Sequence, residues 1–342
     1  MGLFNFFTQE IAMDLGTANT LIIHNDEVVV NEPSIVALNR NNLKEVLAVG
    51  KKALMMHEKT HESIRTIRPL KDGVIADFNA AEHMIRGMIK MLNNGKGWFF
   101  PSLRMVICIP SGITEVEKRA VRDSAEIAGA KEVYLIHEPM AAAVGIGIDV
   151  EEPMGNMIID IGGGTSEIAV IALGGIVADK SIRIAGDDFT NEIEEYMRRQ
   201  HNILVGERTA EQIKIEVGAA IQDLDDPPPP YAVRGRDLMS GIPREILITH
   251  DEVASALDKT IAKIEEAILS ALAATPPELS ADIYKTGIYL AGGGSMLRGL
   301  DKRIADKTKL PVHIAENPLR AVALGTSIAL KNIDKYQFLI RD

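Results

Sequence analysis

The chain is predicted to be an α/β protein formed by duplication, with two similar domains around a nucleotide-binding cleft. Two segments of one pattern carry this prediction: an apolar run, an aspartate, a turn of glycine or threonine, and a second apolar run. One contains Asp14 and the other Asp160. Each pattern is typical of a β-hairpin with a polar tip. A third segment, residues 290–295, places three glycines between a strand-like run and a helix start.

These tips have the chemistry of a phosphate site. Glycines let backbone N–H groups approach a phosphate closely. An aspartate at each tip suits Mg²⁺, which keeps much of its water shell when it binds a protein. Tight turns that need glycine only for backbone geometry are the alternative for any one segment, but the set of three favours binding. The sequence contains no P-loop motif.

Length and composition narrow the class of protein. The 342 residues exceed one ordinary core, so two domains are expected. The net charge of −11 argues against nucleic-acid binding, which needs a basic face. The single cysteine, Cys108, lies in an apolar run and is predicted to be a buried reduced thiol. No apolar run is long enough to span a membrane, and no basic residue precedes Arg40, so we expect a cytoplasmic protein.

Periodicity and capping signals predict the elements of the first half in order. Apolar alternation favours strands, helical spacing favours helices, and proline or glycine marks their ends. The predicted strands are 11–23 (the hairpin), 27–30, 34–38, 105–110 and 133–136; the helices are 51–62, 79–92, 111–129 and one that starts at Pro139; and 69–77 is a loop.

The second half repeats this order, which indicates duplication. After the second hairpin we expect helices 188–200, 209–220 and 250–273, strand 287–291, turn 292–294 and helix 295–307. The proline-rich run 225–230 is predicted to be a stiff surface loop, because proline cannot join a central strand ladder.

The motifs resemble those of the actin, sugar-kinase and heat-shock chaperone ATPase superfamily. More closely, the chain resembles the MreB family of bacterial actin homologues, which organise cell-wall synthesis in rod-shaped bacteria. The matching segments are 14–20, 137–143, 160–165 and 316–319. The likeness covers essentially the whole chain and departs mainly at 225–231 and at the extreme N-terminus.

This resemblance implies an actin-like ATPase fold, with two duplicated ribonuclease H-like α/β domains around a nucleotide cleft and a small subdomain inserted in each. Its subdomains would be IA (1–32, 77–145 and 317–342), IB (33–76), IIA (146–184 and 247–316) and IIB (185–246). The implied cofactors are ATP and Mg²⁺.

The resemblance also implies roles for individual residues. Asp14 and Asp160 would organise the Mg²⁺ shell through water. Glu138 would position the attacking water with help from Thr165, which suits phosphoryl transfer because positioning and charge stabilisation dominate that reaction. An N-cap of the helix opened by Pro139 is a compatible alternative for Glu138. The residues expected to contact the phosphates are Gly16, Thr17, Ala18 and Asn19 from one side and Gly162, Gly163, Gly164 and Thr165 from the other.

A second set would hold the ribose and adenine. Glu211 and Lys214 lie three apart and therefore share a helix face. An ordinary surface ion pair is the alternative for these two. The full set implied by the resemblance is Gly186, Asp187, Glu211, Gln212, Ile213, Lys214, Gly292, Gly293, Gly294 and Ser295.

Residues 57–61 match the His-Glu-x-x-His signature of zinc enzymes, and Glu82 follows at a suitable distance. A zinc site needs a buried, supported second layer of contacts. The neighbouring residues Lys59 and Glu62 are charged. We therefore interpret the segment as a solvated helix in a small inserted subdomain.

Two aromatic clusters suggest membrane contact, although packing against the protein's own surface is the alternative. Exposed apolar patches mark a partner or a membrane, and MreB relatives resemble this chain in using a hydrophobic loop and sometimes the N-terminus to bind the inner leaflet. The clusters are Leu3, Phe4, Phe6 and Phe7, and Trp98, Phe99 and Phe100. The basic residues expected to surround the second are Arg86, Lys90, Lys96 and Arg104.

The resemblance implies a cytoskeletal protein with slow Mg-dependent ATPase activity coupled to polymerisation. Subunits would join head to tail, because heterologous contacts do not close on themselves. Filaments, paired and peripheral on the inner face of the cell membrane, would work with cell-wall elongation proteins and transmembrane adaptors. The alternatives are a monomeric sugar or acid kinase, for which no spare aspartate base is evident, and a chaperone-type ATPase, which would carry a peptide-binding domain.

Overall fold

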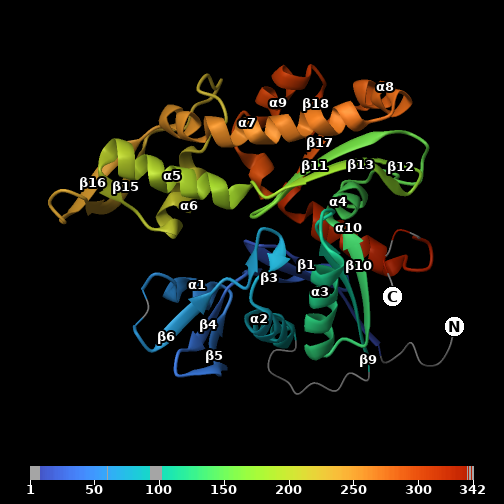
Figure 1. The fold of residues 1–342 in the computed structure, drawn as a ribbon, viewed down its shortest axis with the longest axis horizontal. Coiled ribbons are helices and arrows are strands. Elements are labelled where there is room, and N and C mark those ends of the chain that lie inside the picture. The colour runs from blue at the N-terminus through green and yellow to red at the C-terminus, as the bar shows by residue number, and fades with distance from the viewer. Residues whose placement is uncertain (1–7, 60, 93–101, 337, 339, 341–342) are drawn as a thin grey trace.

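The computed structural model describes residues 8–59, 61–92, 102–336, 338 and 340. It has two lobes, each built on a five-stranded mixed sheet (Figure 1). The lower sheet has the order β10 (Glu132–His137), β9 (Ser102–Ile109), β1 (Thr8–Leu15), β2 (Asn19–His24) and β3 (Glu27–Pro33). The upper sheet has the order β18 (Val312–Ile314), β17 (Ile288–Ala291), β11 (Asn156–Ile161), β12 (Ser166–Ala172) and β13 (Gly175–Ile182).

The two sheets have the same topology, which confirms the predicted duplication. In each sheet the first three strands in chain order form an antiparallel meander. A fourth strand then pairs parallel with the first, and a fifth pairs parallel with the fourth. Both predicted hairpins are present. Their registers are equivalent: Asp14 lies opposite Leu21, and Asp160 lies opposite Glu167.

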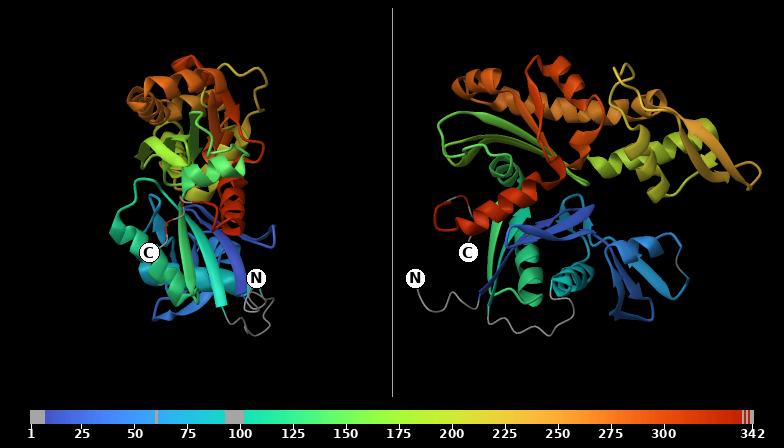
Figure 2. Two further views of the ribbon diagram at one scale, coloured as in Figure 1. Left: turned by 90° about the vertical axis from the view of Figure 1, so that its right-hand side faces the viewer. Right: turned by 180° about the vertical axis from the view of Figure 1, so that it is seen from behind.

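Helices cover the sheets in layers (Figures 1 and 2). Helices α2 (Phe78–Met91) and α3 (Glu115–Ile127) pack on the outer face of the lower sheet. The outer face of the upper sheet is covered by α7 (His250–Ala274), flanked by α8 (Pro277–Thr286) and α9 (Leu300–Thr308).

Two short helices lie between the lobes and share one core with the inner faces of both sheets. They are α4 (Glu138–Gly145) and α10 (Ala321–Lys331). The pair can approach closely because each has a glycine at the crossing. A methyl group added at Gly145 would lie 1.9 Å from Ala321 O, and one at Gly325 would lie 1.7 Å from Ala141 O.

Each lobe carries a smaller inserted part. The lower one is a sheet of β5 (Asn42–Val49), β4 (Val36–Asn39) and β6 (Ile64–Ile67), with helix α1 (Lys51–Met56) and the short hairpin β7 (Leu70–Lys71) and β8 (Val74–Ile75). The upper one holds α5 (Gly186–His201), α6 (Glu207–Val217) and a sheet of β14 (Ile203–Leu204), β15 (Tyr231–Asp237) and β16 (Pro243–Ile248). The boundaries of the four subdomains stay a prediction.

Three predicted helices differ from the structure by four or more residues at one end. The helix predicted over 51–62 ends at Met56, because His57 is extended and Glu58 adopts a left-handed φ of 60°. The helix predicted from 111 begins only at Glu115, after a capping box formed by Thr114 and Glu117. The third, predicted over 295–307, begins at Leu300 and follows a 3₁₀ turn, η2 (Gly293–Met296).

Several elements are absent from the sequence prediction. Helix α10 is a nearly continuous run of small and apolar residues, so it has no clear polar face to mark its period. The missed elements are β5, β6, β13, β14, the β15–β16 hairpin, β18, α8, α10, the short β7–β8 hairpin within the predicted loop 69–77, and the 3₁₀ turn η3 (Pro318–Arg320). Cys108 is a buried free thiol, as predicted.

Candidate functional site

The tips of the two hairpins touch each other between the lobes. A methyl group added at Gly163 would lie 2.7 Å from Ala18 Cβ, and one at Gly164 would lie 2.7 Å from Thr17 Oγ1. Glycine is therefore needed here for close approach of the two backbones. Thr17 Oγ1 also accepts a hydrogen bond from Gly73 N at 3.0 Å, which ties the β7–β8 hairpin to the tips.

The glycine-rich segment after β17 joins the same place. Gly292 has a left-handed φ of 78°, and a methyl group there would lie 2.4 Å from Asp160 Oδ1. Ser295 is buried and donates to Gly292 O at 2.7 Å, which closes the turn. The structure thus brings residues 292–295 to the aspartate of the upper hairpin.

The start of α5 is attached to the upper tip by its backbone. Gly186 N donates to Gly162 O at 3.1 Å, and Asp187 N donates to Gly163 O at 2.8 Å. Asp187 faces a mixed environment. Burial raises its pKa to about 6, although the cations of Arg68 and Lys214 act in the opposite direction.

The Glu211–Lys214 pair belongs to this network. Lys214 Nζ lies 2.6 Å from Glu211 Oε2 and donates to Gly186 O at 2.8 Å. Thr190 Oγ1 donates to the same Glu211 oxygen at 2.7 Å. An ordinary surface ion pair would not hold the start of a neighbouring helix, so the contacts go beyond that alternative.

Two of the predicted ligand residues have side chains that point away from the tips, and a third is exposed. Ile213 is fully buried in the upper core, so its side chain does not face the tips. Gln212 is exposed and donates to Glu216 at 2.7 Å. Asn19 is exposed at the start of β2.

Carboxylates gather behind the tips. Burial, followed by the charges of Asp14 and Glu167, raises the pKa of Asp160 to about 8. Burial also raises the pKa of Asp14 to about 6, while a hydrogen bond from Cys108 Sγ at 3.1 Å opposes the rise. Such mutual repulsion favours a bound cation.

Glu138 belongs to this carboxylate group. Burial, followed by the charges of Glu167, Asp160 and Asp14, raises its pKa well above the usual range. It is the first residue of α4, and the N-cap is His137, whose side chain makes no capping hydrogen bond. The alternative of Glu138 as an N-cap is therefore wrong.

Glu167 is a functional candidate that the sequence analysis missed. It is fully buried on β12, and its Oε2 accepts from Ser111 N at 3.0 Å and from Ser111 Oγ at 2.5 Å. Its Oε1 accepts from Ser181 Oγ at 2.6 Å. The one available signal was a glutamate within the otherwise apolar run of 166–172.

A cavity of about 520 Å³ lies beside the tips and is lined by residues of both lobes. Thr17, Gly164 and Asp187 are the predicted residues among them. The sequence analysis missed the others: Arg68, Leu70, Lys71, Asp72, Arg183, Asp188, Thr190, Asn191 and Glu207.

The zinc-like segment has no helix to present its histidines one turn apart. The expectation of a solvated helix is wrong, because α1 has ended before His57. His57 instead contacts Thr66 and Glu207, whereas His61 contacts Ser63. Within the described residues, no three carboxylate, thiol or imidazole groups are arranged to hold a metal.

The predicted membrane residues Leu3, Phe4, Phe6, Phe7, Trp98, Phe99 and Phe100 lie outside the described residues, as does Lys96. Two of the basic residues expected around the second cluster are paired with carboxylates. Arg86 pairs with Glu82 at 2.8 Å, and Arg104 pairs with Glu10 and Glu132. No helix in the described ranges is long and apolar enough to cross a membrane.

Two lobes of equal topology, with aspartate-bearing hairpins that meet between them, define an actin-like protein. The comparisons agree with this class. Residues 8–338 match the family model described as MreB/Mbl protein, and the chain belongs to this family.

Relatives and a solved structure resemble nearly the whole chain. The cell shape-determining protein Mbl of Bacillus subtilis is 49% identical, and the alignment covers 96% of this chain and 98% of the Mbl chain. The cell shape-determining protein MreB of Escherichia coli is 46% identical, with coverages of 96% and 95%. The crystal structure of MreB 5 of Spiroplasma citri bound to AMPPNP has a TM-score of 0.89 and 38% identity, with coverages of 96% and 97%.

Proposed function

We propose that this protein is a cytoskeletal ATPase that binds Mg-ATP between its lobes, hydrolyses it slowly and polymerises into filaments that organise cell-wall synthesis. The meeting of two glycine tips in front of a buried carboxylate group carries this proposal. The backbone amides of residues 16–19 and 162–165 would contact the phosphates. The AMPPNP bound to the Spiroplasma citri relative supports the nucleotide assignment.

Mg²⁺ fits the donors at this place. Asp14 and Asp160 offer hard oxygen ligands, and burial raises the pKa of both carboxyls, an effect that a bound cation would oppose. No direct three-ligand set exists in the described part of the chain, so the ion would keep most of its waters, as Mg²⁺ prefers. When bound, it would neutralise charge on the phosphates.

Glu138 and Thr165 would act on the attacking water. Glu138, at the start of α4, is close enough to Asp14 and Asp160 for their charges to raise its pKa. Thr165 O accepts a hydrogen bond from Gly162 N at 2.9 Å, which closes the upper tip. The raised pKa of Glu138 means that its ionised carboxylate is a stronger base than an ordinary carboxylate. The nucleoside would lie against Gly186, Lys214 and residues 292–295.

Assembly and location follow from the family and not from any contact in one subunit. Head-to-tail, paired filaments would lie on the inner face of the cell membrane, held by Trp98, Phe99, Phe100 and the N-terminal aromatic cluster. One short segment binds lipid weakly, so many copies in a filament would add avidity. Elongation proteins and transmembrane adaptors would bind the same filaments.

Pelleting with Mg-ATP, with and without anionic liposomes, followed by electron microscopy, tests the proposal. We expect paired filaments on lipid. Protein that stays in the supernatant and turns over ATP only with a sugar or acid acceptor would contradict the cytoskeletal assignment and favour a kinase.

A double variant tests the membrane part separately. Trp98→Ser with Phe99→Ser should abolish liposome binding and leave polymerisation intact. Val116→Ser, which removes an exposed apolar side chain on α3, is the matched control. Liposome binding that survives the double variant would show that this loop is not the anchor.

A further inference from the structure

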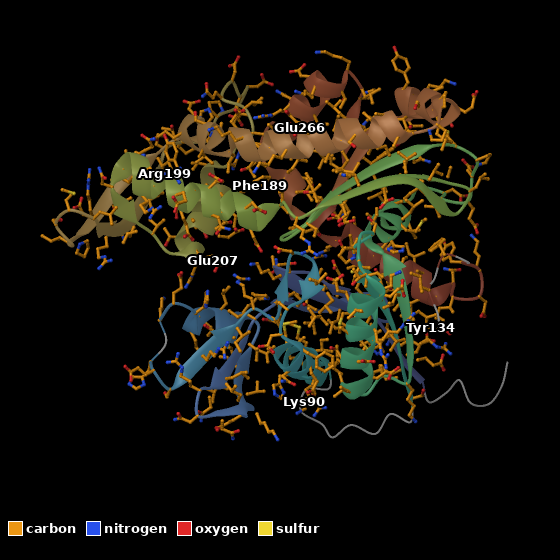
Figure 3. The ribbon with its side chains drawn as sticks, viewed as in Figure 1. Lys90, Tyr134, Phe189, Arg199, Glu207 and Glu266 are labelled. Carbon is orange, nitrogen blue, oxygen red and sulfur yellow. The ribbon has the colours of Figure 1, made fainter. Side chains whose placement is uncertain are left out.

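The two inserted parts meet at the start of helix α6. Glu207 is the first residue of α6, at the end of that helix nearest the lower lobe (Figure 3). Its Oε1 accepts a hydrogen bond from Arg68 Nη2. Its Oε2 lies 3.2 Å from His57 Nε2. Both partners come from the lower inserted part, more than a hundred residues earlier in the chain.

A second contact caps the helix backbone. Glu207 N donates to Glu58 Oε1 at 3.2 Å. The N-cap of α6 is Gly206, which has no side chain to satisfy the free N–H groups of the first turn. A methyl group at Gly206 would lie 2.3 Å from Glu58 Oε2, so glycine leaves the space that this carboxylate occupies. Glu58 therefore supplies the missing cap from the opposite lobe.

Contacts and backbone geometry within the lower inserted part hold His57 and Glu58 in the orientations that the contact with α6 needs. Thr66 Oγ1 lies 2.9 Å from His57 Nδ1 and orients the ring, so that Nε2 faces Glu207. Glu58 has a left-handed φ of 60°, which is uncommon for a residue with a side chain. Strained conformations of this kind persist where the surroundings require them, and they cluster at ligand clamps and switches.

Arg68 neutralises an otherwise acidic meeting point. Glu58, Glu207 and Glu194 face one another there, and burial followed by the charges of Glu58 and Glu207 raises the pKa of Glu194. Without Arg68, these carboxylates would repel across the cleft. The guanidinium is thus the main attractive charge of the contact.

The contact also reaches the nucleotide site. Arg68 and Glu207 line the same cavity as Thr17 and Gly164. Helix α6 carries Lys214, which is bonded to Gly186 beside the upper tip. Movement at the start of α6 would therefore be transmitted through Lys214 and Gly186 to the hairpin tips.

We propose that His57, Glu58 and Arg68 form a clamp that caps α6 across the cleft and slows nucleotide release by holding that helix over the site. They are positioning residues, and the clamp rests on the proposed nucleotide binding. In the closed clamp Arg68 and Glu207 form part of the cavity wall, whereas opening of the clamp frees α6 and allows exchange. Two residues of the zinc-like signature thereby acquire a role that needs no metal.

Release of a fluorescent ATP analogue from the full-length protein, chased with excess ATP and Mg²⁺, tests the clamp. Arg68→Ala should speed release about tenfold and Glu58→Ala about fivefold, in line with the loss of a charged contact or a helix cap. Glu58→Gln should restore most of the slow release, because its amide oxygen can still accept from Glu207 N. Glu62→Ala, an exposed change in the same segment, is the matched control and should match wild type.

A second measurement needs no nucleotide. Amide hydrogen exchange at Glu207 and Arg208 in the nucleotide-free protein should become about fivefold faster in Glu58→Ala and stay unchanged in Glu62→Ala. If wild type fails to retain the analogue, the proposed function fails, while the exchange measurement still tests the cap. Release and exchange rates that equal wild type in both Arg68→Ala and Glu58→Ala would overturn the clamp.

Discussion

The lower and upper hairpins have the same fold but unlike electrostatics. Both place an aspartate at the end of the central strand of a five-stranded sheet. Opposite that aspartate, the lower hairpin has Leu21 and the upper hairpin has Glu167. The lower aspartate receives a hydrogen bond from Cys108, whereas the upper one faces additional carboxylate charge.

This difference shows that duplicated hairpins can keep the same backbone geometry while their aspartates have different pKa values and different bonding partners. The pKa of Asp14 is raised to about 6, and that of Asp160 to about 8. A bound cation would therefore stabilise the upper aspartate more than the lower one. It also bonds to the lower lobe, because Glu167 accepts hydrogen bonds from Ser111 in the turn after β9.

The largest expected effect concerns Glu138, which faces both hairpins. Glu138→Ala should keep ATP binding but slow hydrolysis about 100-fold, the lower range for removal of a positioned base. Phosphate release under single-turnover conditions measures the rate of hydrolysis. Glu126→Ala, an exposed change on α3, is the control. Unchanged hydrolysis in Glu138→Ala would remove this residue from the mechanism.

The second prediction compares the aspartates directly in metal-free protein. Both folded-state pKa values are raised, so the folded state binds protons more tightly than the unfolded state, and stability falls as pH rises from about 4 through the folded pKa. Asp160→Asn should therefore stabilise the metal-free protein at pH 8 by roughly 2–3 kcal/mol, and Asp14→Asn by about 1–2 kcal/mol.

Thermal melts in EDTA at pH 5 and pH 8 measure this difference. The gain from Asp160→Asn should shrink at pH 5, where the wild-type carboxyl is protonated in the folded state. Both variants should bind Mg-ATP more weakly than wild type. A gain that is equal at the two pH values would show that charge repulsion is not its cause.

The sequence predicted the hairpins because their signals are local. An apolar run, an aspartate and adjacent glycines lie within a dozen residues around Asp160. Glu167 and the clamp could not be found in this way. Their partners Ser111 and Glu207 are distant in the chain and meet them only after both lobes have folded. The overlong helix predicted over 51–62 has a related cause. The real helix ends at Met56, and His57, the next residue, contacts Glu207 of α6.

The third prediction concerns a substitution, Glu167→Leu, that gives the upper hairpin the leucine found opposite the aspartate of the lower one. Glu167→Leu should destabilise the protein by about 2 kcal/mol, because Ser111 and Ser181 would lose their acceptor in a buried place. Glu167→Gln keeps an acceptor and removes the charge, so it should be milder and should lower the pKa of Asp160. Urea denaturation monitored by circular dichroism distinguishes them, and equal losses would indicate that packing alone matters.

The smallest expected effect concerns the thiol that distinguishes the lower hairpin. Burial and the neighbouring carboxylates raise the pKa of Cys108 well above its usual range, so the thiol stays protonated and can donate to Asp14. Cys108→Ser keeps a donor, whereas Cys108→Ala removes it and leaves Asp14 more like Asp160. The two variants should differ by about 0.5–1 kcal/mol in metal-free stability at pH 8, with the alanine variant lower. Equal stabilities would mean that the thiol does not distinguish the two aspartates, and would leave the additional charge of Glu167 as the chemical difference between the hairpins.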